Sequence, residues 1–67
     1  MEVVQNIDNY CAVSGITIKE FERLCGLANA LVSKWRSGRQ TPTIKTLKKI
    51  SDATGISIDA WIKENGV

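Results

Sequence analysis

The stretch that decides the fold is GLANALVSKWRSGRQTP, residues 26–42. It opens with Gly26, continues as a short helix with an apolar inner face, and closes with Gly38, basic residues and Pro42. Glycine reaches left-handed backbone dihedrals without strain, so Gly26 can turn the chain sharply and start a helix at a steep angle to the preceding one. The pattern therefore predicts a new helix that begins soon after Gly26 and ends just before Gly38.

The segment before Gly26 is also typical of a helix. Thr17 and Glu20 form a capping box at its start. Apolar residues then recur at helical spacing: Ile18, Phe21, Leu24 and Cys25. Two short helices joined by a glycine turn make a helix-turn-helix, whose second helix enters the major groove in proteins that bind DNA. The sequence therefore predicts a DNA-binding motif of this kind.

Five helices and no strand are predicted, which gives an all-α fold in a single domain over residues 1–67. The helices are expected over residues 3–13, 18–25, 28–37 (beginning at Ala28 or Asn29) and 44–54 (capped by Thr43 and ended by Gly55), with a short last helix ended by Gly66. The apolar positions expected on the first, fourth and fifth helices are Val3, Val4, Ile7, Tyr10, Cys11, Ile44, Leu47, Ile50, Ala53, Ile58, Trp61 and Ile62.

The chain has room for one small domain. A domain of this size buries only about 60% of the surface that its unfolded chain exposes. Disulfides or metals often stabilise such domains, but this chain has two cysteines and no histidine. Cys11 and Cys25 lie on apolar helix faces, so we expect buried, reduced thiols rather than a disulfide or a metal site. No cofactor is expected.

No targeting or membrane segment is recognised. The N-terminus lacks a basic flank followed by a long apolar run, and no segment approaches the roughly 20 apolar residues that span a bilayer. We therefore expect a soluble, cytoplasmic protein with no membrane partner and no small-molecule ligand.

The net charge of +2 at pH 7 is unevenly distributed along the chain. No acidic residue lies between Glu22 and Asp52. The basic residues of that interval are Arg23, Lys34, Arg36, Arg39, Lys45, Lys48 and Lys49. A basic centre over a helix-turn-helix is typical of a protein that binds the DNA phosphate backbone. For Lys48 and Lys49, a face that merely keeps the domain soluble is the alternative.

Residues 16–61 resemble the helix-turn-helix of the Cro and phage-repressor family, also called the Xre family. No single residue is specific, but the ordered set is, because each glycine, cap and apolar residue must fall at one place for five helices to pack. The residues that carry the resemblance are Ile16, Thr17, Phe21, Gly26, Leu27, Val32, Trp35, Ser37, Gly38, Pro42, Ile44, Leu47, Ile50, Ala53, Gly55, Ile56, Ser57 and Ile58. The resemblance implies a Cro/repressor-like domain encoded by a bacterium, a phage or another mobile element.

Three positions depart from the family pattern. Position 18 often carries a glutamine that touches phosphate, which Ile18 cannot do. Position 22 is commonly alanine, so Glu22 implies a looser helix crossing or a carboxylate that turns outward, with Lys19 or Arg36 as its partner. Position 36 is usually a glutamate that pairs with the first helix in some relatives. Here Arg36 and, at the matching site, Cys11 replace that pair, so we expect no ion pair and an Arg36 that is free for phosphate.

The third helix divides into two faces by its period of 3.6 residues. Val32 and Trp35 point inward, and Trp35 is expected in the core rather than stacked on a base. In the family's docking mode the opposite face enters a major groove about 12 Å wide. The residues expected to contact bases there are Asn29, Ala30, Ser33 and Lys34. A stripe that is only solvated is the alternative.

Phosphate contacts are expected on both sides of this helix. The polar loop that follows it lies beside the groove, where it would clamp the backbone. The amino end of the second helix offers backbone amides and the helix dipole, and the fourth helix begins nearby. The expected phosphate-binding residues are Thr17, Lys19, Arg36, Ser37, Arg39, Gln40, Thr41 and Lys45.

The sequence offers no support for catalysis, because it has no histidine, no carboxylates paired near a nucleophile and no phosphate-cradling glycine loop. We therefore expect a non-enzymatic transcriptional regulator, repressor-like, that occupies an operator in double-stranded DNA. A protein-interaction module, such as an adaptor or a toxin-neutralising partner, is an alternative, and so is an accessory protein for excision of a mobile element.

A homodimer on two half-sites is expected, since one recognition helix touches few base pairs. In so short a chain the contact must use the domain itself, and the apolar C-terminal segment offers a surface. The candidate dimer contacts are Ile58, Trp61, Ile62 and Val67, although the core is the better place for Trp61.

Overall fold

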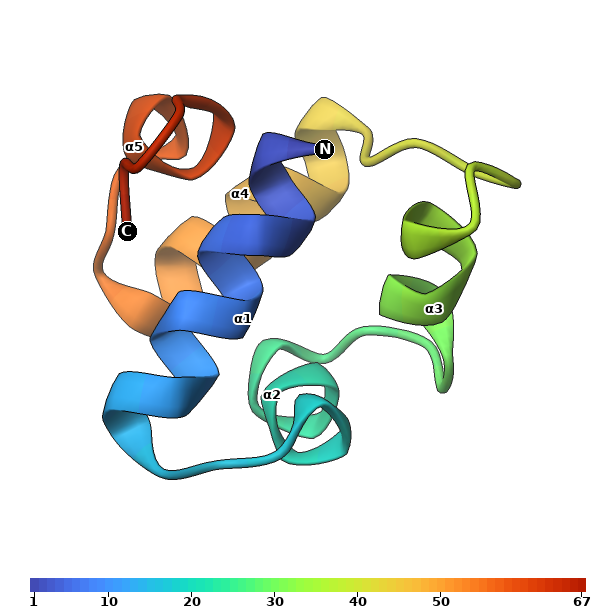
Figure 1. Ribbon diagram of the computed structural model, residues 1–67, viewed down its shortest axis with the longest axis horizontal. Coiled ribbons are helices and arrows are strands. Elements are labelled where there is room, and N and C mark those ends of the chain that lie inside the picture. Colours follow the sequence, from blue (N-terminus) through green and yellow to red (C-terminus); the bar gives the residue numbers. More distant parts are fainter.

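Five helices make up the regular structure of the chain. The computed structural model describes residues 1–67 and contains α1 (Glu2–Ser14), α2 (Ile18–Cys25), α3 (Leu31–Arg36), α4 (Ile44–Thr54) and α5 (Ile58–Ile62) (Figure 1). The predicted all-α, five-helix fold is confirmed. None of these helices combines the length and the apolar character that a membrane span requires.

Hydroxyl groups cap the starts of α2, α4 and α5. The Thr17 hydroxyl accepts from the Glu20 N–H while the Glu20 carboxylate accepts from the Thr17 N–H, which is the predicted capping box. Thr43 and Ser57 each accept from the N–H three residues later. Gly26 ends α2 at φ 68°, in the left-handed region that glycine favours. The bounds predicted for α2 and α4 are therefore confirmed.

The helices pack as an open arrangement around α1. Helix α1 packs against α2, α3 and α5, and α4 packs against α2 and α5. In Figure 1, α3 and α5 lie on opposite sides of α1. Because α3 packs against α1 and α2 alone, one side of it is left uncovered.

A single apolar core draws residues from all five helices. Its buried members are Val3, Val4, Ile7, Cys11, Phe21, Cys25, Val32, Trp35, Leu47, Ile50 and Trp61. Three aromatic rings meet within it, since the ring centroids of Tyr10, Phe21 and Trp61 lie 5.6 to 5.9 Å apart. Trp61 is 0% exposed, so it belongs to the core and its prediction as a dimer contact is wrong.

Cys11 and Cys25 are buried free thiols, as predicted. Burial raises the pKa of the Cys25 thiol to about 11 and also raises the pKa of the Cys11 thiol. Because the thiolate is the reactive form, both side chains behave as small apolar groups near neutral pH.

Four residues predicted on apolar helix faces are exposed instead. Leu24 is 52% exposed, Ile44 is 71% exposed, Ile62 is 49% exposed, and Ala53 is exposed as well. An α-helix turns by about 100° per residue, so positions three apart drift by about 60° at each step. In α4 only the middle pair, Leu47 and Ile50, therefore stays on the core side. The same drift carries Leu24 off the buried face of α2.

The last helix is shorter than predicted. It ends at Ile62 rather than near Gly66, because Lys63 is extended and the Asn6 side chain bonds the carbonyl groups of the final turn. Asn6 is 1% exposed. Its amide group donates to the backbone oxygens of Ala60 (3.2 Å), Trp61 (2.7 Å) and Lys63 (3.0 Å) and accepts from the Val67 N–H (3.2 Å). This one side chain ties the C-terminal segment to α1.

Candidate nucleic-acid interface

One side of helix α3 and of the turn before it faces the core, and the other side faces solvent. Val32 and Trp35 are buried, which confirms the predicted inner face. On the other side lie the residues predicted to contact bases, which we call the reading stripe: Asn29, Ala30, Ser33 and Lys34. The first three are exposed and Lys34 is half-buried. The structure thus places the four residues on one short, solvent-facing segment.

The helix itself is shorter than predicted. It spans Leu31–Arg36, whereas the sequence predicts a start at Ala28 or Asn29 and an end at Ser37. Ala30 stops it from starting earlier, because its φ of 65° is left-handed and not helical. Asn29 and Ala30 therefore belong to the turn before α3, and the other half of the reading stripe is helical.

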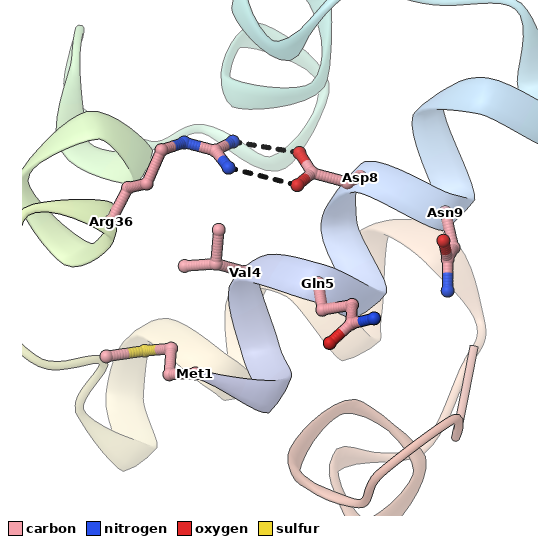
Figure 2. Close-up of a pocket in the computed structure, with 6 residues that line it drawn as sticks. All are labelled: Met1, Val4, Gln5, Asp8, Asn9 and Arg36. Carbon is pink, nitrogen blue, oxygen red and sulfur yellow. Dashed lines mark hydrogen bonds and ion pairs between the residues drawn. The ribbon is translucent and has the colours of Figure 1, made fainter.

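Arg36 on α3 forms an ion pair with Asp8 on α1 (Figure 2). Its Nη1 and Nη2 donate to the two carboxylate oxygens at 3.0 and 2.8 Å. The hydrogen bond from Arg36 lowers the pKa of the Asp8 carboxyl below its usual value. The expectations that no ion pair joins these helices and that Arg36 is free for phosphate are therefore wrong. Asp8 lies about one turn before Cys11 on α1, which lets it supply the partner.

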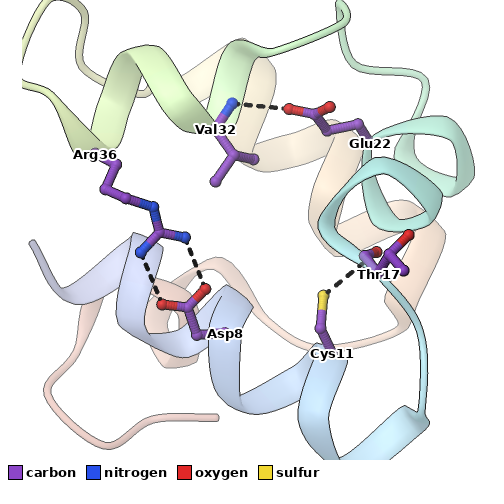
Figure 3. A network of polar contacts seen from close by, with 6 residues as sticks. All are labelled: Asp8, Cys11, Thr17, Glu22, Val32 and Arg36. Carbon is purple, nitrogen blue, oxygen red and sulfur yellow. Dashed lines mark hydrogen bonds and ion pairs between the residues drawn. The ribbon is translucent and has the colours of Figure 1, made fainter.

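Glu22 on α2 turns inward to the start of α3 (Figure 3). Its two carboxylate oxygens accept from the N–H groups of Ala30 at 3.2 Å and Val32 at 2.9 Å, and the residue is 5% exposed. Since α3 has no side-chain cap of its own, Glu22 satisfies N–H groups that a helix start leaves without partners. The predicted outward carboxylate paired with Lys19 or Arg36 is wrong.

The loop after α3 folds back onto the helix. The Lys34 carbonyl accepts from the N–H groups of Arg39 at 3.0 Å and Gln40 at 3.3 Å, and from the Ser37 hydroxyl at 3.1 Å. Gly38, at φ 80°, makes the reversal possible. The side chains of the predicted phosphate-binding loop, Ser37, Arg39, Gln40 and Thr41, are all exposed. They are held beside the carboxyl end of the reading stripe.

The other predicted phosphate contacts lie at the starts of α2 and α4. Lys19 and Lys45 are exposed and form no ion pair. Thr17 is different, because both its N–H and its hydroxyl are engaged with Glu20. A phosphate near the start of α2 would therefore meet the Lys19 ammonium rather than the capping groups of Thr17.

The roles of Asp8 and Glu22 are not predicted from the sequence, although each leaves a signal there. Glu22 lies between Phe21 and Cys25 on the buried side of α2, where a carboxylate without a partner would be costly. A buried carboxylate on one helix can accept hydrogen bonds from the N–H groups at the start of the next helix, and so can cap it through a tertiary contact. Asp8 lies on the same face of α1 as Cys11, about one turn away. It can therefore form the ion pair with α3 that a residue at position 11 forms in some relatives.

The chain matches a protein-family model described as helix-turn-helix over residues 14–61, which is well over half of its 67 residues. The match includes α2, α3 and α4 and reaches into α5. No curated protein and no solved structure matches the chain. The family match agrees with the fold and with the resemblance of residues 16–61, which is thereby confirmed. The chain belongs to the Cro/C1-type helix-turn-helix family of DNA-binding domains, also called the Xre family.

Proposed function

We propose that this protein is a repressor-like transcriptional regulator that recognises a specific sequence of double-stranded DNA with α3 in the major groove. The observation that carries the proposal is the solvent-facing reading stripe on α3 and the turn before it, while Val32 and Trp35 anchor the other face of α3 in the core. Such a helix can enter a groove about 12 Å wide without losing its packing.

The side chains of the reading stripe suit base edges in different ways. The Asn29 amide can form two hydrogen bonds with adenine, and the Lys34 ammonium can reach the acceptors of guanine. The Ser33 hydroxyl can bond a base or a phosphate, and the Ala30 methyl can pack on a thymine methyl. Discrimination between sequences would rest mainly on Asn29 and Lys34, whose contacts are directional.

Phosphate contacts would set the register of α3 on the duplex. The exposed loop that carries Arg39, Gln40 and Thr41 lies at one end of the helix, and Lys19 lies on α2 beside the other. Lys45 is a further candidate at the start of α4. Arg36 is left out of this set, because its guanidinium is engaged with Asp8.

Two contacts support α3 as a rigid reading element. Glu22 bonds the N–H groups at its start, and the ion pair from Asp8 to Arg36 holds its last residue to α1. A recognition helix that is fixed before binding loses less conformational freedom when DNA binds. Both contacts therefore favour a role in recognition.

We also propose a homodimer on DNA, with contacts through the C-terminal segment. Ile62 is 49% exposed, and Ile58 and Val67 pack against the core but are only half-buried, so all three side chains leave some apolar surface exposed. Two copies would place two recognition helices on half-sites about one helical turn apart.

Selection of bound sequences from random duplex DNA tests the proposal. Enrichment of one motif, repeated at a spacing of about 10 base pairs, is the expected result. Sedimentation equilibrium with and without the selected duplex then reports the dimer, and Ile62→Glu should weaken it. A parent protein that enriches nothing at low salt would replace this proposal with the protein-interaction alternative.

A further inference from the structure

A hollow opens between α2 and the turn that precedes α3. Its volume is about 300 Å³, and it is lined by Lys19, Glu22, Arg23, Leu27 and Asn29. Lys19, Arg23 and Asn29 are exposed. Because Asn29 belongs to the reading stripe, the hollow adjoins the surface that would face DNA.

Two cationic side chains that form no ion pair line this hollow. Lys19 and Arg23 are four residues apart on α2, so they lie on one face of the helix about one turn from each other. Neither forms an ion pair, since the one ion pair of the chain joins Arg36 to Asp8. The carboxylate of Glu20, three residues before Arg23, bonds the Thr17 N–H instead.

The carboxylate in the wall of the hollow is already engaged. Both oxygens of Glu22 accept hydrogen bonds from the start of α3, so they are satisfied by the N–H groups of Ala30 and Val32. Two cations against one carboxylate leave the hollow with net positive charge. An anion is the ligand that this arrangement favours.

We infer that the hollow holds one phosphate of the DNA backbone, with Arg23 and Lys19 as its ligands and Asn29 at its edge. A guanidinium presents N–H donors in a planar fork that matches two phosphate oxygens, and an ammonium adds a point charge. The inference rests on the proposed function, because a phosphate of the strand beside α3 is the anion that this position would meet. It adds Arg23, which is not among the individual phosphate-binding residues predicted from the sequence.

The second hollow of the molecule differs in that its arginine is already paired with a carboxylate. It has a volume of about 390 Å³ and is lined by Met1, Val4, Gln5, Asp8, Asn9 and Arg36 (Figure 2). Its arginine is bound by both carboxylate oxygens of Asp8. The arginine of that hollow is therefore not free to bind an anion.

Matched variants test the inference on the full chain. Arg23→Gln and Lys63→Gln each remove one positive charge from an exposed side chain, but Lys63 lies after α5 and outside the hollow. Binding to the selected duplex is measured at several salt concentrations. Arg23→Gln should make the slope of log affinity against log salt less steep, while Lys63→Gln leaves it unchanged. Arg23→Gln combined with Lys19→Gln should make the slope less steep by about one unit, because one phosphate then loses both of its cations. Arg23→Lys, which keeps the charge, should retain the slope.

Uncharged methylphosphonates at single backbone positions locate the contact. The parent should lose affinity when the phosphate beside the hollow is replaced. That loss should be smaller in Arg23→Gln and absent when Lys19→Gln is added. Equal salt slopes for Arg23→Gln and Lys63→Gln, with a parent that binds DNA, overturn this inference alone. A parent that binds no DNA overturns the proposed function and this inference with it. Titration with inorganic phosphate, followed by the amide resonances of Leu27 and Asn29, tests for binding of a free anion. If phosphate shifts these resonances while Arg23→Gln keeps full DNA affinity, the hollow binds a free anion and the assignment to the DNA backbone is overturned.

Discussion

The Glu22 carboxylate accepts a hydrogen bond from the Val32 N–H at 2.9 Å, and this bond joins the two helices of the motif. The second carboxylate oxygen accepts from the Ala30 N–H at 3.2 Å, so the N–H groups on either side of Leu31 are both held by α2. Ala30 has a φ of 65°, which is a costly conformation for alanine and persists where the surroundings enforce it. The position of the reading stripe therefore depends on Glu22.

Glu22→Ala should destabilise the domain by about 1–3 kcal/mol, because it leaves two N–H groups at the start of α3 without their acceptor. Urea unfolding measures the loss. Glu64→Ala is the matched control, since it removes the same charge from an exposed residue. The variant should also lose affinity for the selected sequence more than for random DNA at a temperature where it stays folded. Equal unfolding free energies for the two variants would show that the cap contributes nothing.

Sequence patterns predict what short-range contacts decide. The Thr17 and Glu20 box, the Thr43 cap and the Gly26 turn each depend on residues within one turn of each other, and all three are confirmed. The inner face of α3 follows from helical period in the same way. These features carry the family resemblance, and so the fold could be predicted.

The features that sequence patterns miss depend on how helices meet. The Glu22 bonds and the ion pair from Asp8 to Arg36 join residues 8 to 28 positions apart, and the Asn6 bonds reach 54 or more positions along the chain. No local pattern specifies such partners. The late start of α3 belongs to the same class, because Ala30 is held in its conformation by α2. The site could therefore be located from the sequence, but its internal geometry could not.

The ion pair from Asp8 to Arg36 should make stability depend on pH in the acid range. The hydrogen bond from Arg36 lowers the Asp8 pKa below its ordinary value of 3.8, so the stabilisation is fully present above that value and is lost as the pH falls through the lower, folded-state pKa. Because both side chains are about half exposed, the pair should contribute roughly 0.2–1 kcal/mol.

Urea unfolding of the parent and Asp8→Asn between pH 7 and pH 2 measures this contribution. The difference in unfolding free energy between the parent and Asp8→Asn should be constant at the upper end of this pH range and should shrink below pH 3.8. Asp52→Asn, which removes an exposed aspartate without an ion pair, is the control and should have a smaller effect at pH 7. A difference that persists unchanged to the lowest pH would exclude an electrostatic origin.

Asn6→Ala should be far more damaging than Asn9→Ala, although both asparagines lie on α1 and bond the C-terminal segment. Asn6 is buried and makes four hydrogen bonds, whereas Asn9 is exposed and makes one at 3.3 Å to the Val67 oxygen. Unsatisfied buried groups cost about 1–3 kcal/mol each, so the Asn6 variant should lose at least that much stability. Amide exchange of Ala60 to Val67 should accelerate in Asn6→Ala. Similar stabilities for the two variants would mean that water replaces the Asn6 amide without cost.

Alanine substitutions at Asn29, Lys34 and Arg39 should separate residues that read bases from residues that hold the backbone. If Asn29 and Lys34 contact bases, each variant should lose about 1–3 kcal/mol on the selected sequence and much less on random DNA. Arg39 is exposed in the loop after α3, so its variant should lose affinity equally for both DNAs. The slope of its log affinity against log salt should be less steep by about one unit. Titrations of the three variants on both duplexes at several salt concentrations make the comparison. The same factor of loss for all three on every sequence would identify a nonspecific DNA binder, because a residue that reads bases must discriminate between sequences.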